Sequence, residues 1–336
     1  GRRQRQMCIR DRYKEERLMM KKWICCFALL LLFGCQQDPS RFQDALTVYS
    51  PYPQDLIRPL LKDFEQQYDV KVNLIEGSTQ VLLSDIHRTP LEARGDVFVG
   101  GVLSETIDHS DDFVPYQVFD VDKFHDFQSK NHLVTPFMLM PTVIVVNKDL
   151  IGSIPVRGYE DLLRPALNER VAYSNPYTTT TGYQHMRALY HLHHNTQIIK
   201  QFQHHAVQLE KSSQVVEQVA TGRYDAGLSY ELDARRWMKK GYPLKLVYPT
   251  EGTVINIDGI ALVHNAHPNP KREALVKYLT GRAVQTRLAQ EFGVKPIRKD
   301  VAEVSETGTL KLKDIPAISE SELPHDTHQA FLERLK

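Results

Sequence analysis

Strand-like and helix-like patterns alternate over residues 46–99, and this alternation limits the chain to a small set of folds. The predicted strands cover 46–50, 70–76 and 96–99, and the predicted helices cover 54–68 and 80–87. A β–α–β–α–β order implies a parallel sheet covered by helices. The start of the chain therefore predicts an α/β fold.

Small or polar residues follow each of these strands. Ser50 ends the first strand, Ser78 and Thr79 follow the second, and Gly100 and Gly101 follow the third. In open parallel sheets, ligands bind outside the carboxyl ends of the strands, and glycine allows a close approach of the backbone. We therefore predict a binding edge here, with ordinary turn geometry as the alternative for the glycines.

A second candidate site is the run of threonines from Thr178 to Thr181. A strand predicted over 171–173 leads into an Asn175-Pro176 turn, and a helical pattern follows the threonines. Free N–H groups and the positive dipole end of a helix favour an anion. One hydroxyl is enough to cap a helix, so four in a row favour an anion-binding loop. The alternative is one cap beside solvated neighbours. The predicted ligand residues are Thr178, Thr179 and Thr180.

The rest of the chain repeats the alternation and then returns to the first unit. Further strands are predicted over 137–147, with a break at Pro141, and over 226–230, 245–248 and 255–263. Further helices are predicted over 185–205, 212–222, 231–241 and 270–292. A second lobe over 141–256 is thus inserted into a first lobe made of 45–140 and 257–336. Two lobes joined by crossing strands predict a cleft that closes about a hinge, near Pro141-Thr142 and Ile257-Asp258.

Composition excludes several classes of function. Charged residues make up 25% of the 336 residues and the net charge is +1, so we expect no nucleic-acid partner.

The sequence around Ser229 lacks the last glycine of a hydrolase elbow, so we expect no enzyme. His191 and His194 have no carboxylate or cysteine at a matching spacing, so we expect a solvated helix face there. We predict a monomer without cofactor or metal.

The N-terminal residues have the pattern of a lipoprotein signal. Lys21-Lys22 precede an apolar run that is too short to span a membrane and that ends in Gly34-Cys35. We predict a signal peptide over 19–35 with Cys35 as the lipidated residue, which would anchor the protein at a membrane surface. Residues 1–18 carry no hydrophobic period, and we expect them to be a non-native extension. All 4 cysteines lie at or before Cys35, so no disulfide is expected beyond it.

Several short motifs occur in an order that points to one family. They are Thr47-Val48-Tyr49-Ser50-Pro51, Gly95-Asp96-Val97 with Gly100-Gly101, Asn147-Lys148 before Tyr159-Glu160-Asp161-Leu162-Leu163, and Tyr248-Pro249-Thr250-Glu251-Gly252. Over residues 45–298 the chain resembles class II periplasmic solute-binding proteins, in the group labelled ferric-iron importers that also includes sugar-phosphate and phosphonate binders. The resemblance implies a two-lobed type II periplasmic-binding-protein fold with mostly parallel sheets. It also implies delivery of a solute to an ABC permease and ATPase complex, without catalysis.

The resemblance also bears on the solute. Ferric-ion binders of this group use a histidine, an acid and two adjacent tyrosines, where this chain has Pro53, Gly100 or Gly101, and Leu232-Asp233. None of these supplies an imidazole or a phenolate. We therefore expect a small anionic organic solute, phosphorylated in the favoured case.

Three further residues complete the predicted site. Tyr230 and Glu231 lie next to the tyrosine positions of the iron binders, and Glu231 and Glu251 would accept hydrogen bonds from sugar hydroxyls or pair with an amine. A surface carboxylate is the alternative for both acids. A ferric-iron receptor with a different ligand set and a sensory subunit of the same fold are the alternative functions.

Overall fold

The computed structural model describes residues 45–102, 109–125, 132–324 and 326–335. The extension predicted over 1–18 and the signal peptide predicted over 19–35, with Cys35, lie outside the described residues, so both stay predictions. Within the described part of the chain, no helix is long and apolar enough to cross a membrane.

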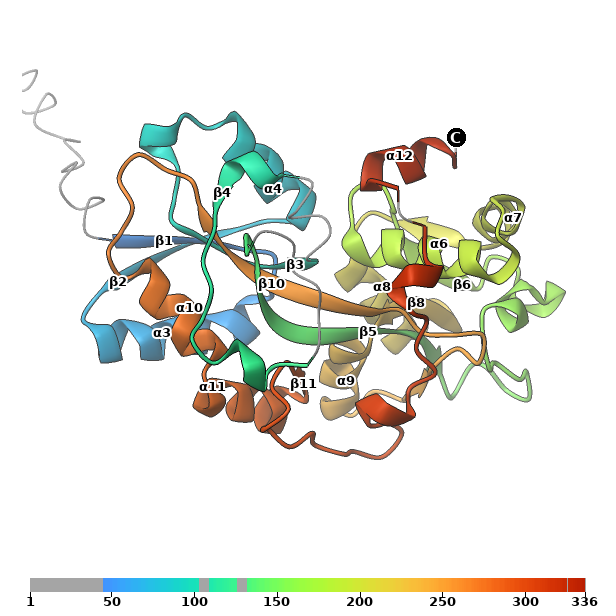
Figure 1. Cartoon of the computed structure of the whole chain (residues 1–336). Coiled ribbons are helices and arrows are strands. Elements are labelled where there is room, and N and C mark those ends of the chain that lie inside the picture. The colour runs from blue at the N-terminus through green and yellow to red at the C-terminus, as the bar shows by residue number, and fades with distance from the viewer. Residues whose placement is uncertain (1–44, 103–108, 126–131, 325, 336) are drawn as a thin grey trace, which may run out of the picture. The chain divides into compact units, whose positions relative to one another are not determined.

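The first lobe contains the strands and helices predicted at the start of the chain. Its sheet has the order β2-β1-β3-β10-β5, with β1 parallel to β3 and β10 antiparallel to both β3 and β5 (Figure 1). The elements are β1 (Ala45–Ser50), α3 (Gln54–Tyr68), β2 (Lys71–Glu76), α4 (Thr79–Arg88), β3 (Val97–Val102), β4 (Phe113–Val114), β5 (Thr135–Asn147), β10 (Ile255–Val263), α10 (Arg272–Thr280), α11 (Arg282–Arg287) and β11 (Lys295–Pro296).

Helices cover both faces of this sheet because β3 is apolar on both sides. Val97 and Val99 belong to the same core cluster as the buried residues of α3 and α10, whereas Phe98 packs with those of α4. Side chains of a strand alternate between its two faces, so one strand supplies both cores. The strands and helices predicted over 46–99 are confirmed with small shifts at their ends, except that β3 continues to Val102 and so includes Gly100 and Gly101, which were predicted to follow it.

The second lobe continues from the far half of β5. There β5 is antiparallel to β8 and β9, and β6 is parallel to both β8 and β7. The elements are β6 (Val171–Ser174), α6 (Thr180–His193), α7 (Gln197–His205), β7 (Val207–Leu209), α8 (Ser212–Ala220), β8 (Ala226–Tyr230), α9 (Glu231–Lys239) and β9 (Leu244–Val247). The two-lobed α/β fold is as predicted, but the sheet is mixed rather than mostly parallel, because the long strands β5 and β10 run antiparallel to their neighbours.

Two predicted helices are divided. The helix predicted over 185–205 is α6 and α7, because His194 adopts a left-handed conformation (φ 53°) and ends α6. The helix predicted over 270–292 is broken at Gly281, which has extended backbone angles between α10 and α11. A π-helical segment over Leu288–Phe292 then follows α11.

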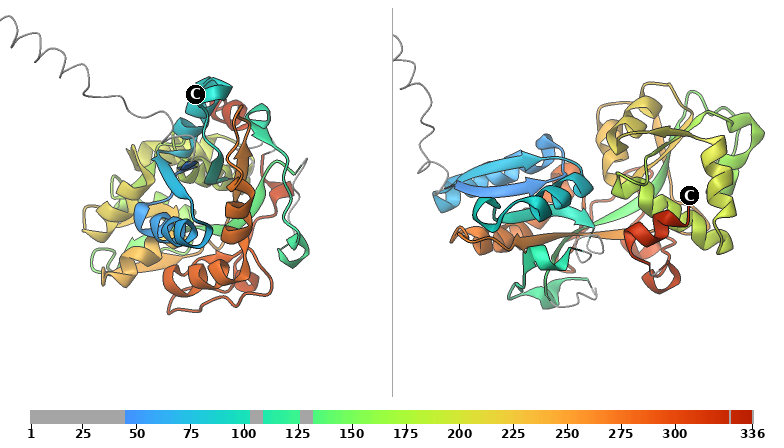
Figure 2. Two further views of the ribbon diagram at one scale, coloured as in Figure 1. Left: turned by 90° about the vertical axis from the view of Figure 1, so that its left-hand side faces the viewer. Right: turned by 90° about the horizontal axis from the view of Figure 1, so that it is seen from above.

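The strand β5 runs from one lobe into the other, and β10 begins where the chain returns to the first lobe and pairs alongside β5 (Figure 1; Figure 2, right). Pro141 does not interrupt β5. It lies where the partner strand changes, since Pro141 pairs with Ile255 of β10 and the next residue, Thr142, pairs with Tyr230 of β8. A proline has no N–H to give to a ladder, so a change of partner is a position that tolerates it.

The second chain segment that crosses between the lobes lies slightly earlier in the sequence than predicted. Both the N–H and the hydroxyl of Thr142 donate to the carbonyl of Val254, at 2.9 and 3.2 Å. Ile257 and Asp258, the predicted hinge residues, instead pair with Leu139 and Met138 inside the first lobe. The strands therefore cross at 141–142 and 254–255.

The end of the chain packs with the second lobe. The helix α12 (His328–Glu333) contributes Phe331 and Leu332 to the core cluster that contains Tyr183 and Met186 of α6. The predicted first lobe includes all of 257–336, whereas this part of the tail is buried against residues of the second lobe.

Candidate functional site

The predicted binding residues of the first lobe come together at the ends of β1 and β3. Gly100 and Gly101 have positive φ angles of 116° and 74°. A Cβ atom added to Gly100 would lie 2.9 Å from Pro51, and one added to Gly101 would lie 2.9 Å from the methyl group of Thr79. Both the backbone conformation and the close approach require glycine here.

The two predicted serines differ in what their hydroxyls do. Ser50 is buried, its hydroxyl donates to the carbonyl of Val99 at 2.8 Å, and the N–H of Tyr52 donates to it at 3.2 Å. Ser78 is exposed at the N-cap of α4 and makes no cap hydrogen bond with its side chain. Ser50 thus stabilises the turn after β1, while the Ser78 hydroxyl faces solvent beside a helix N-terminus.

The threonine loop of the second lobe is the start of α6. Thr179 is its N-cap, and its hydroxyl accepts from the N–H of Gly182 at 3.2 Å while lying 2.8 Å from both the Ser174 hydroxyl and the Asn175 carbonyl. The predicted position at a helix N-terminus is confirmed. Thr179 is buried in a capping role, Thr178 is exposed and Thr180 is partly exposed.

A histidine near the end of the chain links the two loops. His328, the first residue of α12, has its Nδ1 atom 3.0 Å from the Gln80 side-chain nitrogen and its Nε2 atom 3.3 Å from the Pro176 carbonyl. Its ring centroid lies 4.0 Å from that of Tyr183. Gln80 belongs to the first turn of α4 and Pro176 to the loop before α6. His328 therefore contacts the first turn of α4 through Gln80 and the first turn of α6 through Tyr183, so one side chain links the N-terminal turns of two helices from different lobes.

Four buried polar side chains form two hydrogen-bonded pairs at β10. The hydroxyl of Tyr52 donates to Asp258 at 2.7 Å, and the amide of Asn256 donates to the hydroxyl of Tyr230 at 2.9 Å. Asn256 and Asp258 are two residues apart, so they share one face of the strand. Tyr52 follows β1 and Tyr230 ends β8, so both lobes contribute.

The Asp258 carboxyl has an unusual environment. Burial is the main cause that raises its pKa to about 7, the hydrogen bond from Tyr52 acts in the opposite direction, and the charge of the nearby Asp233 adds to the effect of burial. Tyr52, Asn256, Asp258 and His328 are not among the predicted binding residues. Alternation of isoleucine with Asn256 and Asp258 in β10 was a usable signal, since it marks a strand with one polar face.

Glu231 lies within a buried ion network. Its Oε1 atom is 3.3 Å from Arg235 and 3.4 Å from Lys295, and only 2% of its side chain is exposed. Burial raises its pKa, and the two cations oppose that effect. Arg235 also contacts Glu306 at 3.0 Å and donates to the carbonyl of Gly293. This network connects α9 with β11 and the segment after it.

Glu251 has local partners. Its Oε1 atom accepts from the N–H of Glu160 at 3.1 Å, and the hydroxyl of Thr250 donates to its other oxygen at 3.3 Å. A Cβ atom at Gly158 would lie 1.6 Å from that second oxygen. These contacts close the turn before a short 3₁₀ helix (Glu160–Leu163).

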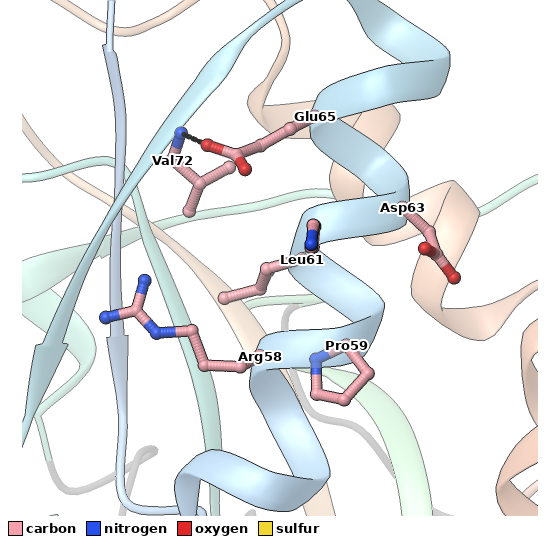
Figure 3. Close-up of a pocket in the computed structure, with 7 residues that line it drawn as sticks. Arg58, Pro59, Leu61, Asp63, Glu65 and Val72 are labelled. Carbon is pink, nitrogen blue, oxygen red and sulfur yellow. Dashed lines mark hydrogen bonds between the residues drawn. The ribbon is translucent and has the colours of Figure 1, made fainter.

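A surface pocket lies elsewhere, beside α3 and β2. Figure 3 shows the side chains around it, and Glu65 accepts a hydrogen bond from the N–H of Val72 at 2.8 Å. The lining residues are Arg58, Pro59, Leu61, Lys62, Asp63, Glu65 and Val72. None of the predicted binding residues is among them.

Residues 46–293 match the bacterial extracellular solute-binding protein family. The chain belongs to this family. Its structural neighbours include type II periplasmic binding proteins, which confirms the predicted resemblance and fold. Solute-binding proteins of this family act outside the cytoplasm, deliver ligands to ABC permeases and form a non-enzyme class.

Three solved structures indicate the range of similar solute-binding proteins. One, described as a two-component system protein that mediates signal transduction, is 59% identical with a TM-score of 0.83, over 87% of this chain and 100% of that chain. AfuA from Actinobacillus pleuropneumoniae, with exogenous fructose-6-phosphate bound, is 18% identical with a TM-score of 0.77, over 87% and 96% of the two chains. Iron-bound HitA from Pseudomonas aeruginosa is 13% identical with a TM-score of 0.74, over 87% and 98%.

An uncharacterized protein of Haemophilus influenzae is 22% identical over 236 residues, which are 66% of this chain and 68% of that one. The two structures below 20% identity show the shared fold alone, and they include a sugar-phosphate complex and an iron complex.

Proposed function

We propose that this solute-binding protein captures a small anionic organic solute, with a phosphorylated sugar as the favoured case, by closing its two lobes around it. The observation that carries this proposal is that His328 links the N-terminal turns of α4 and α6. The first N–H groups of a helix have no partner within it, and the dipole there favours negative charge. A phosphate between the two helices would accept hydrogen bonds from both lobes.

Side chains around these helix ends supply the remaining contacts. Ser78, Thr178 and Thr180 would add hydroxyl donors, and the bare backbone at Gly100 and Gly101 allows close approach. The polar face of β10, with Tyr52, Tyr230, Asn256 and Asp258, has donors and acceptors suited to sugar hydroxyls. The fructose-6-phosphate complex of AfuA supports this chemistry for the fold.

The ferric-iron alternative has weaker support. The positions that match the tyrosine pair of iron binders hold Leu232 and Asp233, and the carboxylate beside them, Glu231, is within 3.4 Å of both Lys295 and Arg235. A cation entering this site would have to displace two buried positive charges. We infer that bare iron is not the solute.

A second candidate function concerns the step after solute capture. The 59% identical protein is described as part of a two-component system. This identity favours a sensory role, in which the closed form contacts a membrane-bound signalling partner, over delivery to a permease and ATPase complex. In either case we propose that the protein is anchored through a lipid on Cys35.

A thermal-shift screen of the purified protein tests the solute class. The compounds are hexose phosphates, phosphoglycerates, phosphonates, unphosphorylated hexoses and ferric citrate. A true solute at ~100 times its dissociation constant stabilises the folded state by about 2.7 kcal/mol. We expect a phosphorylated compound to reach this shift. A shift with ferric citrate alone, or with the sugar regardless of its phosphate, overturns the proposal.

Two cell experiments separate the downstream roles. Deletion of the gene abolishes uptake of labelled solute if the protein serves a permease, whereas it abolishes solute-induced transcription with uptake through other routes intact if the protein is a sensor. Cys35→Ser should release the protein into the soluble fraction, and a mutant that stays processed and membrane-bound excludes Cys35 as the anchor.

A further inference from the structure

Two histidines and an aspartate gather in the first lobe, apart from the residues of the proposed solute site. His87 lies in the last turn of α4, His109 is the N-cap of a short 3₁₀ helix (Ser110–Asp112), and Asp112 is the last residue of that helix. One ligand atom from each of the three side chains lies within 4.8 Å of the other two. The solute-binding function makes no use of this cluster.

The distances suit a tetrahedral metal ion. The Nδ1 atoms of His87 and His109 lie 3.0 and 3.6 Å from the same oxygen, Oδ2 of Asp112. Zinc bonds to nitrogen and oxygen of 2.0–2.2 Å place neighbouring ligand atoms of a tetrahedron roughly 3.3–3.5 Å apart. The observed distances bracket that value, so small rotations of the two rings would seat an ion.

The carboxylate of Asp112 is held in place by Arg94. Only 5% of its side chain is exposed, and its other oxygen, Oδ1, lies 3.2 Å from the guanidinium of Arg94. Arg94 is itself fixed, because it donates to the carbonyls of Thr89, His87 and His264 at 2.8, 3.2 and 3.3 Å. Partners of this kind orient metal ligands and strengthen binding. Oδ2 is left directed at the two histidines.

The two rings leave an approach for an ion and for water. The His87 side chain is 66% exposed and that of His109 is 28% exposed. The rings are steeply inclined, with an interplanar angle of 71° and centroids 6.2 Å apart, so they do not stack on each other. A hydrogen-bonded cluster is the alternative explanation, in which Asp112 simply accepts from both histidines.

We propose that His87, His109 and Asp112 bind a divalent transition-metal ion of the zinc, cobalt or nickel type, with water in the remaining coordination positions. Imidazole nitrogen with one carboxylate suits these ions, whereas magnesium and calcium prefer oxygen ligands alone. The C-terminal end of a helix, where His87 lies, also favours positive charge. The ion would join the end of α4 to the segment that leads into β4.

Titration calorimetry of the purified, tag-free protein with zinc chloride tests the proposal. We expect one ion per chain. The double variant His87→Gln, His109→Gln should weaken zinc binding by more than ~100-fold, since loss of an outer-shell partner alone costs up to about that factor. Both side chains are at least partly exposed, and an unchanged thermal unfolding curve without metal would verify that the variant folds.

The chain offers a matched control. His191 and His194 on α6 form a second histidine pair, with ring centroids 5.6 Å apart, and this pair is not part of any metal-binding group among the described residues. His191→Gln, His194→Gln should therefore bind zinc as the native protein does. Cobalt provides a second readout, because its visible absorption should appear in the native protein and the control but not in the His87, His109 variant. Absence of binding, or loss in the control instead, overturns the proposal.

Discussion

The two lobes prepare for a solute in different ways. In the first lobe, the edge is made of bare backbone, with Gly100 and Gly101 in conformations that favour glycine and the Ser50 hydroxyl bound to neighbouring main chain. In the second lobe, the edge is a hydroxyl-rich loop whose central threonine, Thr179, caps its own helix. A count of hydroxyls thus overestimates the donors that remain for a ligand. What both edges share is the N-terminus of a helix.

The lobes also contain buried titratable groups whose effects on stability have opposite signs. In the first lobe, the pKa of Asp258 is raised to about 7 by burial. In the second, burial lowers the pKa of His185 to about 4, while its hydrogen bond to the Ser229 carbonyl acts in the opposite direction. In both cases burial disfavours the charged form of the side chain. The charged form of Asp258 occurs at high pH, whereas that of His185 occurs at low pH.

The largest expected effect concerns Asp258. The folded protein holds a proton on this carboxyl that the unfolded chain loses above its ordinary pKa, so this contribution to stability falls as pH rises from about 4 to 7. The amplitude is on the order of 4 kcal/mol, at 1.36 kcal/mol per pKa unit. Asp258→Asn should remove it. Urea denaturation at several pH values should therefore show the variant gaining stability relative to the native protein as pH rises. A constant difference would mean that Asp258 titrates normally.

His185 should produce the reverse trend. Its folded-state pKa lies below the unfolded value, so its contribution is present near neutrality and is lost as pH falls from about 6.5 to 4, by on the order of 3 kcal/mol. His185→Gln should lose stability relative to the native protein as pH rises through this range. The amide of glutamine can still accept from Tyr159, which lies 2.8 Å from Nδ1 of the histidine. Parallel profiles for the two variants would remove the contrast between the lobes.

Glycine substitutions compare the two edges directly. A Cβ atom at Gly182 would lie 2.2 Å from the Ser174 carbonyl oxygen, which is main chain and cannot move aside cheaply. At Gly101 the nearest atoms are side-chain atoms of Thr79 and Phe98, at 2.9 and 3.0 Å, and the positive φ of 74° disfavours alanine by roughly 1–2 kcal/mol. Gly182→Ala should cost about 3 kcal/mol of unfolding free energy, toward the upper end for overpacking, and Gly101→Ala about half as much. Equal costs in urea denaturation would mean that the threonine loop is more adaptable than its contacts indicate.

Hydroxyls that are not used for capping should govern affinity. Thr178→Val with Thr180→Val removes two of the proposed donors to the solute while leaving the Thr179 cap in place. Hydrogen bonds to a charged group contribute about 1.5–3 kcal/mol each, so the solute found in the screen should bind at least ~100-fold more weakly. Calorimetry measures the affinity, and urea denaturation without solute measures any accompanying change in stability. An unchanged affinity would place the anion away from this loop.

The sequence predicted the fold well where side-chain periodicity carries the information, as at the boundaries of α3 and β10. The break predicted at Pro141 was wrong, because this proline lies where β5 changes its partner strand and needs no N–H for the ladder. The prediction of one long helix over 185–205 was wrong because His194 ends α6 in a left-handed conformation. No glycine at this position signals the end of the helix in the sequence.

The site was predicted less completely than the fold. His328 and the pair of His87 with His109 come together only through tertiary packing, because their partners are distant in the sequence. Arg235 is four residues after Glu231 on the same helix, a spacing that indicates the pair, whereas no local pattern reveals the contact of Glu231 with Lys295. Residue types near strand ends indicate where a site lies, and the fold decides which of their polar groups are already bonded.

The smallest effect should come from Thr179, and it is the sharpest test of how hydroxyls are divided in the second lobe. Its hydroxyl accepts from the N–H of Gly182 and lies in contact with Ser174 and Asn175. Loss of an N-cap hydroxyl costs about 1 kcal/mol of stability. Thr179→Val should therefore lower the unfolding free energy by that amount, while the dissociation constant of the solute changes by less than about threefold, which corresponds to roughly 0.7 kcal/mol. The neighbouring double variant of Thr178 and Thr180 serves as the matched control with the opposite expected outcome. A Thr179 variant that keeps its stability and loses its affinity would reverse the assignment, and the buried hydroxyl would then be the one that binds the anion.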